Sequence, residues 1–265
     1  MRLRTLFASF AILIFSTSVA FADTKFNQVK PSEFDPGKTF LVQAAWLDGI
    51  GCPTNATTAI PNASFTGVAG KGSYTDPTCT SGDPNDKRNE GLLLAKTGPT
   101  TTNFASATAE LKGVKGMTLT ELGYDLRKSG GSGASALGSH CGAGAPRFDI
   151  ETTKAFYFLG CNSPPGTVTS SSTGWIRLRW GGSAGALMAF NAETFVLENV
   201  IGDVKRITIV FDEGTDASGA PDMFGLAVLD NVDVNGTLVG RGGSAGGGDR
   251  NNQDNGKGDG QGDRD

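Results

Sequence analysis

Segment 175–180 (WIRLRW) combines residue types that bind sugars. Alternation along an extended chain places Trp175, Arg177 and Arg179 on one side of it. An aromatic ring stacks on the apolar face of a sugar, and guanidinium groups donate hydrogen bonds to its hydroxyls. Tyr157, on a neighbouring predicted strand, is expected to join them. The pattern predicts a glycan-binding face; the alternative is that Trp175 packs under a loop and both arginines form surface ion pairs.

Acidic residues gather after residue 211 and again near the end of the predicted domain. Asp212 and Asp216 belong to one loop, and Asp230 lies in the strand that follows it. Calcium takes several oxygen ligands, with carboxylates among them. These three residues are therefore candidate ligands of a structural calcium. The alternative is a solvated turn, in which Asp is favoured by turn chemistry alone.

Five other carboxylates lie in or beside predicted strands. Glycoside hydrolysis uses two carboxylates on opposite sides of the scissile bond. The spacing of the five selects no pair, so a glycan-active hydrolase is the third hypothesis, behind two non-catalytic ones. The five are Glu90, Glu110, Glu121, Asp125 and Asp149.

The four cysteines are Cys52, Cys79, Cys141 and Cys161. An even number in an exported protein indicates disulfides. We favour Cys52–Cys79 and Cys141–Cys161, because each closes a local loop of about 20 to 30 residues, worth about 3 kcal/mol on the chain-entropy model. The alternative is a zinc site, but the cysteines lack Cys-x-x-Cys spacing and His140 is the one histidine.

The elements that must position these groups are short strands between Gly- and Pro-rich turns. This pattern is typical of an all-β fold, and we expect an antiparallel β-sandwich of jelly-roll type in a single domain. Residues 48–90 have the composition of a long loop that needs a staple. A short helix is considered for 192–201. The expected strands are 39–47, 92–96, 104–111, 117–126, 148–150, 155–159, 175–180, 204–211 and 224–234.

The closing strand also carries a family resemblance. Residues 224–234 (FGLAVLDNVDV) resemble the last strand of jelly-roll sandwiches that include many carbohydrate-binding modules and lectin-like domains. In those families an Asp at the place of Asp230 often ligates a structural calcium that ties the last strand to the first. The resemblance implies the same role for Asp230, with Glu33 or Asp35 as its partner. Segments 122–127 (LGYDLR) and 138–148 (GSHCGAGAPRF) resemble exported bacterial proteins with no assigned activity.

The two ends differ from the part between them. Arg2 and Arg4, the apolar run 6–15 and the site Ala20-Phe21-Ala22 predict a cleavable signal peptide over 1–22. The alternative is a membrane anchor, which needs about 20 apolar residues. No later segment is long and apolar enough to be expected to span a membrane. Residues 23–240 form the predicted domain, and 241–265, rich in Gly and Asp, form a predicted disordered tail.

Charge narrows the expected partners. The signal peptide holds two arginines and no acid, so its removal moves the net charge from −4 to −6. An acidic chain is not expected to bind nucleic acid, which requires a basic face.

The first hypothesis for the function is a secreted, periplasmic or extracellular non-catalytic module that binds a glycan and holds a structural calcium. The second is a structural or adhesive protein of the cell envelope that binds another cell-surface protein.

Overall fold

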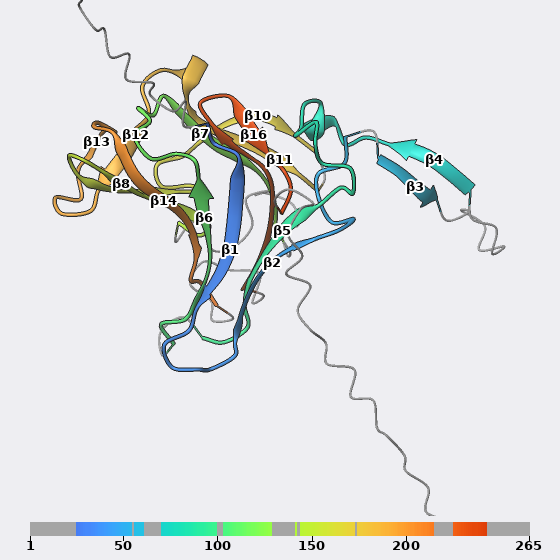
Figure 1. Ribbon diagram of the computed structural model, residues 1–265, viewed down its shortest axis with the longest axis horizontal. Helices are drawn as coiled ribbons and strands as arrows, with labels where there is room; N and C mark the ends of the chain where they lie inside the picture. Colours follow the sequence, from blue (N-terminus) through green and yellow to red (C-terminus); the bar gives the residue numbers. More distant parts are fainter. Residues whose placement is uncertain are drawn as a thin grey trace, which may run out of the picture.

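The computed structural model describes residues 25–54, 56–60, 70–99, 103–128, 141, 144–172, 174–214 and 225–242. The predicted signal peptide and most of the predicted tail lie outside these residues. In the described part, two antiparallel sheets pack face to face (Figure 1). The expected antiparallel β-sandwich is confirmed.

The first sheet has seven strands in the order β1-β6-β14-β8-β9-β12-β13. Both of its edge strands, β1 and β13, come from parts of the chain far apart in sequence. The strands are β1 (Gln28–Phe34), β6 (Ser106–Lys112), β14 (Val204–Phe211), β8 (Arg147–Thr152), β9 (Phe156–Gly160), β12 (Met188–Asn191) and β13 (Leu197–Asn199).

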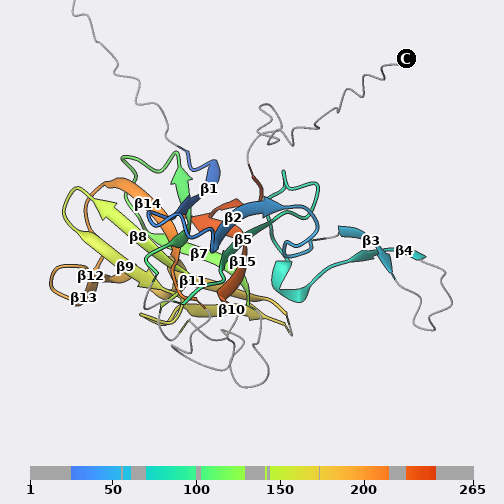
Figure 2. The ribbon, with the colours of Figure 1, turned by 90° about the horizontal axis from the view of Figure 1, so that it is seen from below.

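The second sheet has the order β10-β11-β7-β15-β5-β2, with β16 paired to β15. A separate hairpin of β3 (Ala56–Ile60) and β4 (Gly70–Tyr74) projects away from the sandwich in both views (Figures 1 and 2). The strands of the second sheet are β10 (Thr167–Ser171), β11 (Ile176–Gly181), β7 (Glu121–Lys128), β15 (Gly225–Val234), β5 (Gly91–Lys96), β2 (Val42–Leu47) and β16 (Thr237–Val239).

The chain crosses repeatedly from one sheet to the other. The strands β5, β6, β7 and β8 alternate between the second and the first sheet, and β14 is followed by β15 in the opposite sheet. Residues near in sequence therefore face each other across the core. This connectivity places polar outward-facing side chains from distant segments side by side on each outer face.

The core forms from the inward positions of both sheets. Ile176, Leu178 and Trp180 of β11 enter it, as their alternation predicts. The rings of Tyr124, Phe148 and Trp180 meet there, with centroids 5.3 to 6.2 Å apart. Burial of these large apolar side chains holds the sheets together.

The helix considered for residues 192–201 does not form. The chain makes a hairpin there, with β12 and β13 joined by a turn. The side chain of Asn191 accepts hydrogen bonds from the N–H groups of Glu193 and Thr194, which favours a turn. Phe195 follows with a φ of 56°, which a right-handed helix does not accommodate. The short helical turns η1 (Pro77–Cys79) and η3 (Gly182–Ala184) lie elsewhere.

A long loop lies over the outer face of the second sheet. We call residues 48–54 and 75–90, which flank the β3–β4 hairpin, the cover loop. Ile50, Cys52 and Cys79 of this loop pack with Trp175 and Val228 in a second apolar cluster outside the main core. The described residues contain no helix long and apolar enough to cross a membrane.

Candidate binding face

The cover loop buries the face that the sequence predicted to bind a glycan. Trp175 is 3% exposed and packs against Cys52 and Cys79. Its backbone oxygen accepts a hydrogen bond from the Thr78 hydroxyl at 3.1 Å. The ring therefore offers no open face on which a sugar could stack, and the arrangement matches the alternative in which Trp175 packs under a loop.

Both arginines of this face form ion pairs that are buried instead of lying at the surface. Arg177 bonds both carboxylate oxygens of Asp125 and also the hydroxyl of Ser81 in the cover loop. Arg179 lies 2.9 Å from the carboxylate of Asp233. Burial lowers the pKa of Arg177, but hydrogen bonding and attraction to Asp125 outweigh it, so the pKa is raised. Burial dominates at Arg179 and lowers its pKa.

A register irregularity in β15 adds Asn231 and Asp233 to this network, beside Asp125 of β7. The register between β15 and β7 shifts between Asp230 and Asp233, and Asn231 takes a φ of 44° there. Such a bulge places consecutive side chains on one side of the strand. Asn231 donates to Asp125 and accepts from the N–H of Asp83 in the cover loop. Asn231 of segment 229–234 (LDNVDV) therefore links the second sheet to the cover loop.

Two of the three calcium candidates, Asp212 and Asp230, do not come together. Asp230 faces outward from the second sheet and accepts the N–H of Cys52 at 2.7 Å, while its other oxygen accepts the N–H of Asn231. Burial raises the pKa of Asp230 well above its usual range. Asp212 follows β14 on the outer face of the first sheet, where it pairs with Arg147. Asp216 lies outside the described residues, and the described donors do not fit a shared calcium.

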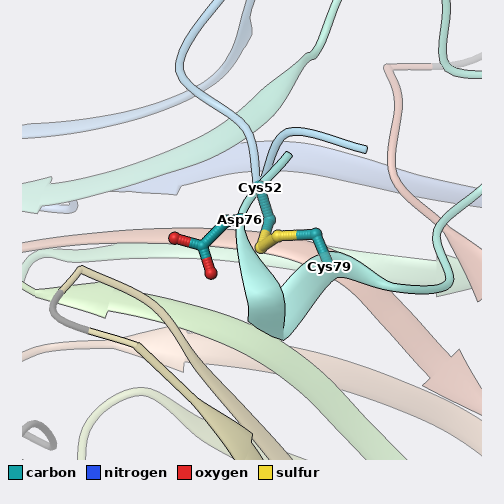
Figure 3. Close-up of side chains that lie close together, drawn as sticks. All are labelled: Cys52, Asp76 and Cys79. Carbon is teal, nitrogen blue, oxygen red and sulfur yellow. A yellow bond between two sulfur atoms is a disulfide. The ribbon is translucent and has the colours of Figure 1, made fainter. Parts of the chain in front are cut away.

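One cluster of metal-ligating residue types lies in the cover loop (Figure 3). It consists of Cys52, Asp76 and Cys79. The two cysteines are joined in a disulfide, as predicted, so neither supplies a thiolate. Asp76 accepts hydrogen bonds from the N–H of Thr78 and from the hydroxyl of Ser172. The cluster therefore links the cover loop to the turn before β11. The second predicted disulfide, Cys141–Cys161, is also present.

Tyr157 does not lie near the three other residues proposed for sugar binding. It is fully buried on the inner side of β9, in the first sheet, whereas Trp175, Arg177 and Arg179 lie outside the second sheet. Its hydroxyl accepts a hydrogen bond from the N–H of Ile201 at 3.4 Å. The core of the sandwich separates the two locations.

The outer face of the first sheet carries a groove that combines exposed aromatic rings with hydroxyl groups. The rings of Phe34 and Phe104 line it and are 56% and 85% exposed. Hydroxyls from Ser32, Thr108 and Thr208 lie along the same groove. Large exposed apolar side chains gathered in a groove with polar groups indicate an interaction site.

Arg147 lies at the centre of this face. Its guanidinium donates to Asp149 at 2.9 Å and to Asp212 at 2.7 Å, and it also lies 5.7 Å from the ring centroid of Phe158. Burial lowers the pKa of Arg147, but the two carboxylates outweigh it and the pKa is raised. Burial raises the pKa of Asp149 despite the arginine. The guanidinium therefore joins the two carboxylates through charge-assisted hydrogen bonds.

The register of the first sheet assembles this groove from separate segments. Phe34 pairs with Ser106, two residues from Phe104, and Val210 pairs with Arg147. Alternation in segment 147–152 (RFDIET) does place Arg147 and Asp149 outward, and that signal is present in the sequence. The exposed phenylalanines are isolated in the chain and carry no such signal.

A second polar groove lies on the cover loop and is lined by Asp83, Asp86, Lys87 and Arg88. Asp86 accepts hydrogen bonds from the N–H groups of Arg88 and Glu90. Burial raises the pKa of Asp86. This groove has no aromatic ring among its lining residues, so it lacks a stacking surface.

The other carboxylates considered for hydrolysis are dispersed. Asp125 lies under the cover loop, Glu90 pairs with Arg88, and Glu110 pairs with Lys112. Asp149 alone among the five lines the groove of the first sheet.

No protein-family model, curated protein or solved structure matches this chain.

Proposed function

We propose that the protein is an exported, non-catalytic binding module that holds a glycan in the groove on the outer face of the first sheet. The observation that carries the proposal is the combination of the exposed rings of Phe34 and Phe104 with the Arg147 carboxylate cluster in one groove. The rings supply apolar stacking surfaces, and the cluster supplies donors and acceptors for hydroxyls.

The state of the carboxylates supports binding over hydrolysis. Asp149 and Asp212 both accept hydrogen bonds from the same guanidinium. A general acid or a nucleophile must be free to move a proton or to attack the substrate. Carboxylates held by an arginine are suited to orienting hydroxyl groups instead. Two disulfides are typical of an oxidising compartment, which agrees with the predicted signal peptide.

A glycan array probed with the oxidised protein tests this proposal. We expect binding to at least one neutral glycan, and we expect the double variant Phe34→Ala/Phe104→Ala to lose about 5- to 150-fold in affinity, because each lost aromatic contact removes about 0.5 to 1.5 kcal/mol. The matched control is Phe40→Ala, since Phe40 is 88% exposed but does not line this groove.

The other outcomes separate the alternatives. Equal loss in the Phe40 control would remove the assignment of the groove. Capture of a defined cell-surface protein, with no glycan bound, would favour an adhesive envelope protein. Turnover of a bound glycan that disappears in Asp149→Asn would favour a hydrolase.

A further inference from the structure

A second groove on the first sheet adjoins the proposed glycan site. Phe158, Phe190 and Phe195 line it, and Phe195 is 74% exposed. Arg147 lines both grooves. The two grooves therefore meet at one side chain and form a continuous surface. We infer that this surface binds an extended, uncharged glycan chain along its length; this inference rests on the proposed function.

The strand order gives the length of the surface. Phe34 belongs to β1 and Phe190 to β12, and the strands between them follow the order β1-β6-β14-β8-β9-β12. Five inter-strand steps of about 4.8 Å span about 24 Å, room for about five sugar rings that advance about 5 Å each. The phenylalanine rings of the two grooves therefore lie on both sides of Arg147, along the direction that crosses the strands. A single sugar would occupy a fraction of this surface.

Two glycines whose backbones pack closely against each other, Gly144 and Gly160, line the second groove. A Cβ atom added to Gly160 would lie 2.7 Å from the Cα of Gly144, closer than the backbones allow. Glycine at position 160 is therefore needed for the close approach of these two backbone segments at the groove.

The charges of the surface favour an uncharged ligand. The guanidinium of Arg147 already has two carboxylate partners, Asp149 and Asp212. Arg206 lies at the edge of the groove, 59% exposed and 3.7 Å from Glu151. An anionic glycan would have to compete with these carboxylates for both arginines. Hydroxyl groups can instead accept and donate within the existing network.

The test is isothermal titration of the oxidised full chain with neutral β-linked oligosaccharides of two to six units, from the cello, manno and xylo series. Oligogalacturonates of the same lengths serve as anionic probes. We expect at least one neutral series to bind, with affinity rising tenfold or more from two to five units. Phe195→Ala should lower the affinity of the hexasaccharide severalfold, while Phe40→Ala should leave it unchanged.

Three results would overturn the inference. Equal affinity for the disaccharide and the hexasaccharide would show a site for one or two sugars and would leave the proposed function intact. Stronger, salt-sensitive binding of the oligogalacturonates would show an anionic ligand, again with the proposed function intact. Binding to none of these probes or to any glycan on the array would remove both the inference and the proposed function.

Discussion

Arg177 donates from Nε and Nη2 to the two carboxylate oxygens of Asp125, at 2.7 and 2.8 Å. This bidentate pair links β11 to β7 beneath the cover loop, and Ser81 of that loop bonds the same guanidinium. The pair therefore joins the second sheet to its cover. The residues proposed from the sequence for ligand recognition form an internal connection of the fold.

Breaking this pair should destabilise the protein strongly. We expect Asp125→Asn to cost about 3 to 5 kcal/mol of unfolding free energy, because Arg177 is left buried without its full charge partner. Urea denaturation of the oxidised protein measures the change. The control is Glu110→Gln, whose partner Lys112 is about 38% exposed at the surface; that change should cost less than about 1 kcal/mol. Equal effects would contradict the proposed role of the buried pair.

The Cys52–Cys79 disulfide should protect Trp175 from solvent. The double variant Cys52→Ala/Cys79→Ala removes a link across 27 residues and should cost about 3 kcal/mol. It should also raise quenching of Trp175 fluorescence by acrylamide, because the cover loop loosens. Trp175→Phe in the same background shows which part of the quenched fluorescence comes from Trp175.

The other disulfide provides a matched control for this prediction. Cys141→Ala/Cys161→Ala removes a link across 20 residues in a different part of the fold, so it should lower stability without exposing Trp175. If both double variants exposed Trp175 equally, the specific role of the cover-loop disulfide would be refuted.

Asp230 should make stability depend on pH. Its pKa is raised in the folded protein, chiefly by burial, so the folded state holds this proton more tightly than the unfolded state. Its contribution to stability is present at low pH and is lost as the pH rises from its ordinary pKa of about 3.9 through the raised value. Asp230→Asn removes this dependence.

The measurement is chemical denaturation of wild type and Asp230→Asn between pH 4 and pH 8. The stability difference should shift in favour of the variant as the pH rises, and then level off. The difference cancels the contributions of Asp149 and Asp233, whose pKa values are also raised. A difference that is constant over this range would contradict the prediction.

Calcium should leave the melting temperature unchanged. Both oxygens of Asp230 already accept backbone N–H groups, and one of these belongs to Cys52 in the cover loop. Hydrogen bonding thus makes the link between the last strand and an early segment that the family resemblance assigns to calcium. Thermal melts with calcium and with a chelator test this. A rise of several degrees with calcium would show a native-state site by linkage.

Local patterns in the sequence predicted the central strands of both sheets and the two disulfides, but β1, β10, β12 and β13 were not among the expected strands. Alternation in segment 175–180 defines which side chains of β11 face the core, because a strand has a period of two whatever it packs against. The cysteine pairs could be predicted because each closes a short local loop. Likewise, Arg147 and Asp149 could be placed on the outward side of their strand.

Tertiary structure alone decided which outward face is open. The sequence shows that Trp175 points away from the core, but alternation contains no information about a distant loop that covers it. Phe34, Phe104 and Phe195 belong to separate segments, and pairing across the first sheet brings them onto one face with Arg147. Which side of a strand a residue faces is a local property, whereas exposure depends on contacts between residues far apart in the chain.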